Sequence, residues 1–147
     1  MIELDDYWMG RDDDYPLDMT PDIARNAART VSIVNELLLE AMAEGVLVQD
    51  KPGADYGCCA SGWRPPKVNA NTKGASTTSM HMTGEALDIY DPDGLIDAWL
   101  VQPKGQATLE RLGLWMEHPD DTPRWAHVQV RPPRSGNRVF RSGVKHT

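Results

Sequence analysis

Two histidines and an aspartate have the residue types and the spacing of a metal site: His81, Asp88 and His127. His81 and Asp88 are seven residues apart, so on one uninterrupted strand they would point to opposite sides. Gly84 lies between them and lets the backbone turn, which allows the imidazole and the carboxylate to converge. Two imidazoles and one carboxylate give a tetrahedral zinc three ligands and leave the fourth position for water. The spacing alone also allows two ordinary core histidines and a strand-end aspartate.

Two short segments with alternating side chains are expected to carry Asp88 and His127. In residues 86–90, Asp88 shares one face of the predicted strand with its neighbours two positions away, and apolar residues take the other face. In residues 125–130, Trp125, His127 and Gln129 share a face in the same way. Trp, His and Gln in alternation are typical of a cleft lining, so we expect both polar faces to border one cleft.

Three sequence blocks carry a resemblance to a known family. They are Ser61-Gly62-Trp63-Arg64, then Ser79-x-His81-x-x-Gly84-x-Ala86-x-Asp88, then Trp125-x-His127. In order and separation they resemble the zinc D-alanyl-D-alanine carboxypeptidase and L-alanyl-D-glutamate endopeptidase family, whose core is shared by the hedgehog signalling domain. The resemblance covers about residues 20–130, and the acidic N-terminal stretch is similar to bacteriophage members. It implies His81, Asp88 and His127 as zinc ligands, Arg64 as the group that grips a substrate carboxylate or carbonyl, and Ser79 as a contact to the substrate or behind the ligands.

The catalytic base is where this chain departs from that family. Many relatives carry an acid three residues before the second histidine, but here that position holds Arg124, which cannot accept a proton. We expect Glu117 to serve as the base instead. Asp120 and Asp121 remain alternatives, although they lie in ordinary turn sequence.

The choice of Glu117 depends on how the last hairpin pairs. Glu117 has the strand parity of Trp115, and pairing across residues 118–124 would set it opposite Trp125 and diagonal to His127. Neighbours on paired strands point to the same side of a sheet, so Glu117 is predicted to face the cleft.

Three side-chain assignments stay open at this level. Arg64 is a substrate anchor or a structural ion-pair partner. Trp125 is a substrate contact or a core residue. His118 is a turn residue or a hydrogen-bond donor to the transition state.

The predicted fold is α+β, a single domain over residues 1–147 with helices on one face of a small antiparallel sheet and the zinc cleft on the other. A long helix is expected to start after Thr20 and to stop at Gly45. The first 19 residues are expected to pack across the domain surface, and Cys58 and Cys59 to be two buried thiols. Further expected elements are strands at 46–48, 58–63, 86–90, 114–117 and 125–130, helices after 91–92 and at 106–112, and a long loop at 66–79.

Composition limits the partners. The chain of 147 residues has a net charge of −7, which argues against general binding to nucleic acid or anionic membranes. No apolar run reaches the roughly 20 residues that a membrane helix needs. Only residues 131–147 are basic, and they are too poor in aromatic residues to favour a nucleic-acid arm, so we expect them to wrap the acidic body or to meet an anionic cell wall.

The resemblance implies a monomeric zinc peptidase that hydrolyses peptidoglycan stem peptides, as a phage endolysin or virion-associated lysin. The cut would lie between L-Ala and D-Glu or before a terminal D-Ala. Because the N-terminus lacks signal-peptide features, we expect synthesis in the host cytoplasm before action on the bacterial cell wall. The alternative is a catalytically silent, zinc-stabilised cell-wall-binding or virion structural domain.

Overall fold

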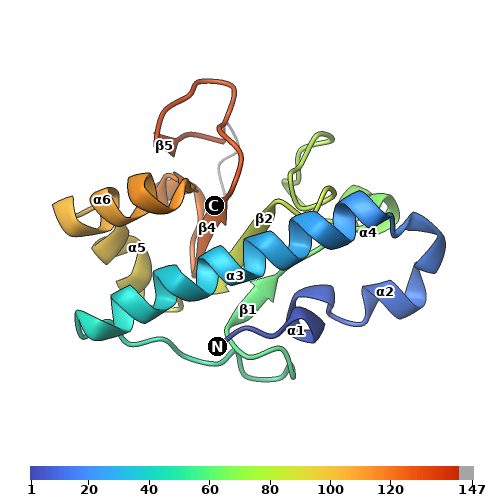
Figure 1. Ribbon diagram of the computed structural model, residues 1–147, viewed down its shortest axis with the longest axis horizontal. Coiled ribbons are helices and arrows are strands. Elements are labelled where there is room, and N and C mark those ends of the chain that lie inside the picture. Colours follow the sequence, from blue (N-terminus) through green and yellow to red (C-terminus); the bar gives the residue numbers. More distant parts are fainter. Residues whose placement is uncertain (143–147) are drawn as a thin grey trace.

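The computed structural model describes residues 1–142 and has the predicted α+β architecture (Figure 1). Lys145 and His146 of the basic segment lie outside the described residues. The elements in chain order are α1 (Leu4–Trp8), α2 (Arg11–Asp14), η1 (Pro16–Asp18), α3 (Pro21–Ala43), β1 (Cys59–Ser61), α4 (Pro66–Ala70), β2 (Ala86–Tyr90), α5 (Leu95–Leu100), α6 (Pro103–Leu112), β3 (Trp115–Glu117), η2 (Pro119–Asp121), β4 (Trp125–Gln129) and β5 (Val139–Phe140).

The five strands form one sheet in the order β1-β2-β4-β3-β5. The pairs β1–β2, β2–β4 and β3–β4 are antiparallel, as expected. The four expected strands thus form an antiparallel sheet, and a fifth strand that was not predicted, β5, runs parallel to β3 at the edge. This fifth strand comes from the basic C-terminal segment, and residues 138–140 of that segment pack against the domain.

The long helix α3 has the predicted boundaries. Thr20 caps it, since its Oγ1 accepts a hydrogen bond from the backbone N–H of Ile23 at 3.1 Å, and Pro21 takes the first helical position. Gly45 follows the end of the helix in the left-handed conformation, with φ +85°. Figure 1 shows α3 crossing the sheet obliquely. Its buried stripe includes Val34, Leu37 and Leu38, so one face of the sheet is covered.

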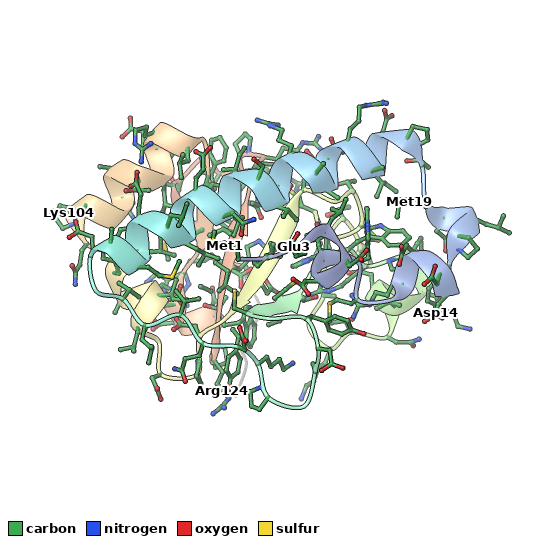
Figure 2. The ribbon with its side chains drawn as sticks, turned by 60° about the horizontal axis from the view of Figure 1, so that its bottom comes forward. Met1, Glu3, Asp14, Met19, Lys104 and Arg124 are labelled. Carbon is green, nitrogen blue, oxygen red and sulfur yellow. The ribbon has the colours of Figure 1, made fainter. Side chains whose placement is uncertain are left out.

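The N-terminal residues lie deeper than the sequence suggested. They were expected on the surface, but Tyr7 and Trp8 belong to the core, and Tyr7 is 0% exposed. The Tyr7 hydroxyl donates a hydrogen bond to the Ala86 carbonyl at 2.7 Å, on strand β2. Figure 2 shows the segment running from Met1 beside the middle of α3 to Met19 near the start of that helix. The first residues are therefore part of the support of the sheet.

Smaller differences concern turns and helix starts. Residues 46–48 form no strand, and the expected loop at 66–79 begins with the short helix α4. The helix after Asp91 begins at Leu95, and the one expected at 106–112 begins three residues earlier, at Pro103. Cys58 and Cys59 are buried free thiols, as expected, and burial raises the pKa of the Cys58 thiol to about 11.

The sheet separates an apolar face from a polar one. Leu87 and Ile89 of β2, and Ala126 and Val128 of β4, point into the core and are fully buried. The residues between them, among them Asp88 and His127, point to the opposite face. Among residues 1–142, no helix combines the length and apolarity needed to cross a membrane.

Candidate metal centre

Strand register and one tight turn bring the three predicted ligands together. Asp88 on β2 and His127 on β4 are direct cross-strand partners. His81 precedes the turn at Gly84, which has φ +80°. A Cβ on Gly84 would lie 2.9 Å from the Ile23 carbonyl oxygen on α3, so only glycine fits both the conformation and the space. The predicted role of Gly84 in this convergence is confirmed.

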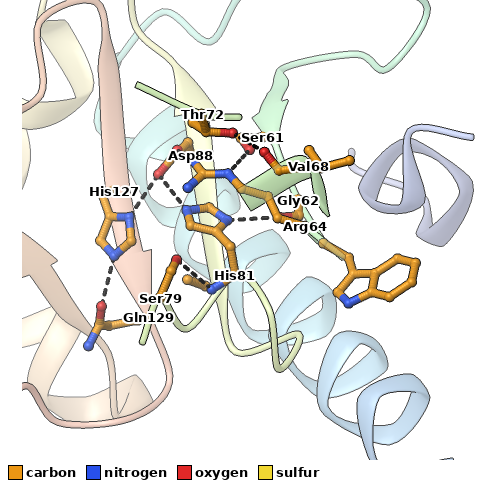
Figure 3. Close-up of polar contacts among 12 residues, drawn as sticks. Ser61, Gly62, Arg64, Val68, Thr72, Ser79, His81, Asp88, His127 and Gln129 are labelled. Atoms are coloured by element: carbon orange, nitrogen blue, oxygen red, sulfur yellow. Dashed lines mark hydrogen bonds and ion pairs between the residues drawn. The ribbon is translucent and has the colours of Figure 1, made fainter. Parts of the chain in front are cut away.

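The ligand atoms face one another across a small gap (Figure 3). Asp88 Oδ1 lies 3.3 Å from His81 Nε2 and 2.8 Å from His127 Nδ1. The candidate ligand atoms of all three residues lie within 4.8 Å of one another. A tetrahedral zinc with bonds of about 2.0–2.2 Å separates its ligand atoms by about 3.4 Å, so the observed spacing needs only small adjustments.

Hydrogen bonds behind the ligands orient both imidazole rings. His81 Nδ1 lies 2.8 Å from the Gly62 carbonyl oxygen and must donate to it, which leaves Nε2 as the atom with the free lone pair. His127 Nε2 lies 2.8 Å from Gln129 Oε1. The Gln129 amide is itself fixed, because its Nε2 donates to the Arg131 carbonyl at 2.8 Å. These partners favour His81 Nε2 and His127 Nδ1 as the metal-binding atoms.

An unpartnered ring nitrogen of His81 and the types of the three ligands both fit a bound metal ion. His81 is 2% exposed and its Nε2 makes no hydrogen bond, although it lies near Asp88. A buried nitrogen without a hydrogen-bonding partner is costly, and a cation at this point would satisfy it. Nitrogen and oxygen ligands in this 2:1 combination suit zinc. The group could hold a metal ion, and neither cysteine belongs to it.

Charge and burial shift the three pKa values in different directions. Burial alone would raise the pKa of Asp88, but the charge of His81 and the hydrogen bond to His127 lower it below its ordinary value. Burial lowers the pKa of His81. Burial also acts to lower the pKa of His127, yet the hydrogen bond to Asp88 and its charge outweigh it and raise that pKa to about 8. A metal must therefore displace a proton from His127 at neutral pH.

Arg64 contacts the ligand carboxylate from the other side. Its Nη2 donates to Asp88 Oδ2 at 3.2 Å, and its Nε donates to Ser61 Oγ at 3.1 Å (Figure 3). The Arg64 side chain is 11% exposed and lines the same cleft as the ligands. Arg64 therefore forms the structural ion pair that was one of its two predicted roles. It also borders the cleft, which the other predicted role, that of a substrate anchor, requires.

The cleft has a volume of about 750 Å³ and brings all seven predicted site residues together. Its lining includes the three ligands and also Arg64, Ser79, Glu117 and Trp125. Ser79 contacts the His81 segment, since its Oγ accepts a hydrogen bond from the His81 backbone N–H at 3.2 Å.

Glu117 faces the cleft, but in a different register from the one expected. Trp115 pairs with Gln129 and Met116 with Val128, so continuation of the ladder sets Glu117 opposite His127. The predicted pairing of Glu117 with Trp125 was wrong by two residues, a shift that keeps the side chain on the same face. Burial raises the pKa of Glu117 to about 7.

The alternative acids are engaged elsewhere. Asp121 is 2% exposed and accepts hydrogen bonds from Arg141 Nε at 3.0 Å and Nη2 at 3.1 Å. Asp120 is exposed, and its backbone N–H donates to His118 Nδ1 at 3.0 Å. His118 therefore caps the turn η2. Neither aspartate belongs to the cleft lining.

Several contacts of the site were not predicted. Gly62 lies inside one of the sequence blocks, but no side-chain pattern reveals that its carbonyl orients His81. The alternation of β4 correctly placed Gln129 in the cleft lining, but not its hydrogen bond to His127. Phe140 lies in the basic segment, and its ring packs edge-on against His127 with centroids 6.0 Å apart.

Comparisons with protein-family models, curated proteins and solved structures found no match to this chain.

Proposed function

We propose that this chain is a zinc-dependent peptidase that hydrolyses peptidoglycan stem peptides. The observation that carries the proposal is the convergence of His81 Nε2, Asp88 Oδ1 and His127 Nδ1 in one cleft with the carboxylate of Glu117. Three ligands that leave a tetrahedral metal one open position are the arrangement of catalytic zinc sites, whereas structural sites use four protein ligands. Zinc held there supplies a Lewis acid that polarises a carbonyl and acidifies water.

Glu117 is the proposed general base. A base works best when its pKa lies near the working pH, and burial gives Glu117 a pKa of about 7. Its carboxylate takes a proton from the water that attacks the peptide carbonyl carbon. The same proton then passes to the amine nitrogen as the carbon–nitrogen bond breaks, so that a carboxylate end and an amine end leave.

Charge in the cleft supports an acidic peptide as the substrate. The whole chain carries a net charge of −7, yet four cationic residues line this cleft. They are Arg64, Lys73, Arg134 and Arg141. Arg64 is paired with Asp88 and Arg141 with Asp121. Stem peptides present free carboxylates, and a guanidinium binds a carboxylate with two parallel hydrogen bonds. Because Arg64 uses Nε and Nη2 on Ser61 and Asp88, its Nη1 is the nitrogen that would meet the substrate.

The sequence resemblance adds an expected cleavage site in the stem peptide and an expected biological role. It favours cleavage between L-Ala and D-Glu or before a terminal D-Ala, by a monomeric phage endolysin or virion-associated lysin that is made in the host cytoplasm and acts on the cell wall.

Mass spectrometry of purified peptidoglycan tests the proposal. Sacculi are incubated with the zinc-loaded protein and, as the control, with a His81→Ala plus His127→Ala variant. The wild type is expected to release fragments whose masses identify one cut in the stem peptide, and the variant none. A wild type that binds zinc and sediments with sacculi but releases no fragment would contradict hydrolysis and support the silent cell-wall-binding domain.

A further inference from the structure

The end of the described chain returns to the metal centre. Strand β5 pairs with β3 in parallel, with Met116 beside Val139 and Glu117 beside Phe140. The backbone N–H of Met116 donates to the Arg138 carbonyl at 2.9 Å, and that of His118 donates to the Phe140 carbonyl at 2.7 Å. Residues 138–140 are thus hydrogen-bonded along the strand that carries the proposed base.

Phe140 is the apolar neighbour of two site residues. Its ring meets the ring of His127 edge to face, with centroids 6.0 Å apart and planes at 89°. It also lies beside Glu117 in the ladder and contributes to the cleft lining. His127 already has hydrogen-bonding partners on both ring nitrogens. Phe140 adds a packing contact to the ring itself, which restricts its rotation.

An arginine fixes the chain on each side of Phe140. Arg141 grips the buried carboxylate of Asp121 through Nε and Nη2, and the Ser142 backbone N–H donates to the same carboxylate at 3.1 Å. On the other side, Arg138 Nη1 donates to the Leu114 carbonyl at 2.7 Å. The Arg138 guanidinium also lies over the Trp115 ring, 4.6 Å from its centroid. The Arg138 and Arg141 side chains thus both donate hydrogen bonds to other residues of the domain.

We propose that residues 138–142 are a built-in wall of the metal centre, in which Phe140 is a positioning residue for His127. The Asp121–Arg141 pair is the clasp that holds this wall in place. Phe140 keeps the His127 ring at the angle that presents Nδ1 to the metal. The inference rests on the metal site of the proposed function, but it does not depend on the substrate.

Zinc affinity, measured by competition with a chromogenic chelator, tests the wall without any assay of activity. Four variants are compared with the wild type: Phe140→Ala, Phe140→Leu, Arg141→Gln and Arg131→Gln. Phe140→Ala is expected to weaken zinc binding by about tenfold, as loss of a contact behind a ligand does. Phe140→Leu keeps an apolar side chain and is expected to restore most of the affinity. Arg141→Gln opens the clasp and is expected to weaken binding severalfold.

Arg131→Gln is the matched control. Arg131 belongs to the same basic segment, but its side chain pairs with Glu85 at 3.3 Å and takes no part in the clasp. The substitution changes only this side chain and keeps the backbone carbonyl that accepts the hydrogen bond from Gln129. Its loss of one positive charge is expected to leave zinc affinity unchanged. Wild-type affinity in both Phe140→Ala and Arg141→Gln would overturn the proposal, as would equal losses in Arg131→Gln and Arg141→Gln. Phe140→Leu keeps an apolar side chain, and Arg141→Gln keeps the backbone contacts of the segment. The proposal can therefore be tested with these two variants even if Phe140→Ala fails to fold.

The two proposals fail in different ways. Zinc binding by a wild type that cleaves no peptidoglycan overturns the peptidase and leaves the wall to be judged by the affinities. A wild type that binds no zinc overturns both.

Discussion

Gly62→Ala is the sharpest perturbation of the support behind the metal centre. Gly62 lies where the chain of β1 passes the helix α1, and an added Cβ would stand 2.0 Å from the Tyr7 carbonyl oxygen and 2.8 Å from its carbonyl carbon. Both are backbone atoms, so no side-chain rotation relieves the contact. The Gly62 and Tyr7 backbones must therefore move apart, and we expect this to displace the Gly62 carbonyl that accepts the hydrogen bond from His81.

Two magnitudes follow from this displacement. Overpacking in a well-packed interior costs about 1–3 kcal/mol. For a chain of this size that lowers the melting temperature by roughly 2–4 °C per kcal/mol. Loss of an oriented partner behind a metal ligand weakens metal binding by about 10–100-fold. The variant is expected to show both effects.

The control that separates the two effects is Gly105→Ala. Its added Cβ would stand 2.2 Å from the Trp99 carbonyl oxygen and 2.5 Å from Leu100 Cα, a clash of the same kind on α6, outside the cleft lining. Thermal melts give the melting temperature of each variant. Zinc affinity is then measured by chelator competition at a temperature well below both melting points. Gly105→Ala is expected to lose stability but keep its zinc affinity. Equal zinc affinity in the two variants would refute the role of the Gly62 carbonyl.

Three further perturbations test other contacts. Arg64→Ala removes one of the two cationic partners of the buried Asp88 carboxylate and leaves His127, so the metal-free protein is expected to lose about 1.5–3 kcal/mol and the zinc-loaded protein less. Equal losses in melts with and without zinc would contradict this. Burial raises the pKa of Asp97 to about 7, above its value of about 3.9 in the unfolded chain. Protonation of this carboxyl group therefore stabilises the folded state fully below about pH 4, and this stabilisation is lost as the pH rises through 7. Urea titrations across that range should show a steeper fall for the wild type than for Asp97→Asn. Added zinc at 100 times its dissociation constant should stabilise the protein by about 2.7 kcal/mol, and melts of a His81→Ala plus His127→Ala variant should not respond.

The ligands were predictable because their strands follow simple rules. Alternation in residues 86–90 and 125–130 places Asp88 and His127 on one face, and the cross-strand register confirms that they are partners. The glycine after His81 supplied the turn. Local capping signals at Thr20 and Gly45 were enough to bound the long helix.

The register of the last hairpin was not predictable from local sequence. Its loop contains the turn η2, and the buried Thr122 donates a hydrogen bond to Asp97 on α5 at 2.9 Å. That tertiary contact draws the loop toward the helix, so β4 extends past the end of β3. Because the resulting shift is even, the predicted face of Glu117 survived the error.

Strand β5 and the buried Tyr7 were missed for a similar reason. A two-residue strand has no periodicity, and its pairing with β3 depends on arginine contacts far away in sequence. Tyr7 follows two acidic residues in a short helix, so composition favoured the surface. Its burial depends on the space beneath β1 and β2, which local sequence does not reveal.

The rate of peptidoglycan hydrolysis by Glu117→Gln decides whether Glu117 is the general base. Glutamine keeps the shape of the side chain but cannot accept the proton, so the variant should hold as much zinc as the wild type. At equal zinc content, its rate of peptidoglycan hydrolysis is expected to fall by about a hundredfold or more. A near-normal rate in Glu117→Gln, with zinc still bound, would contradict the assignment of Glu117 as the base and the proposed role of the cleft in hydrolysis.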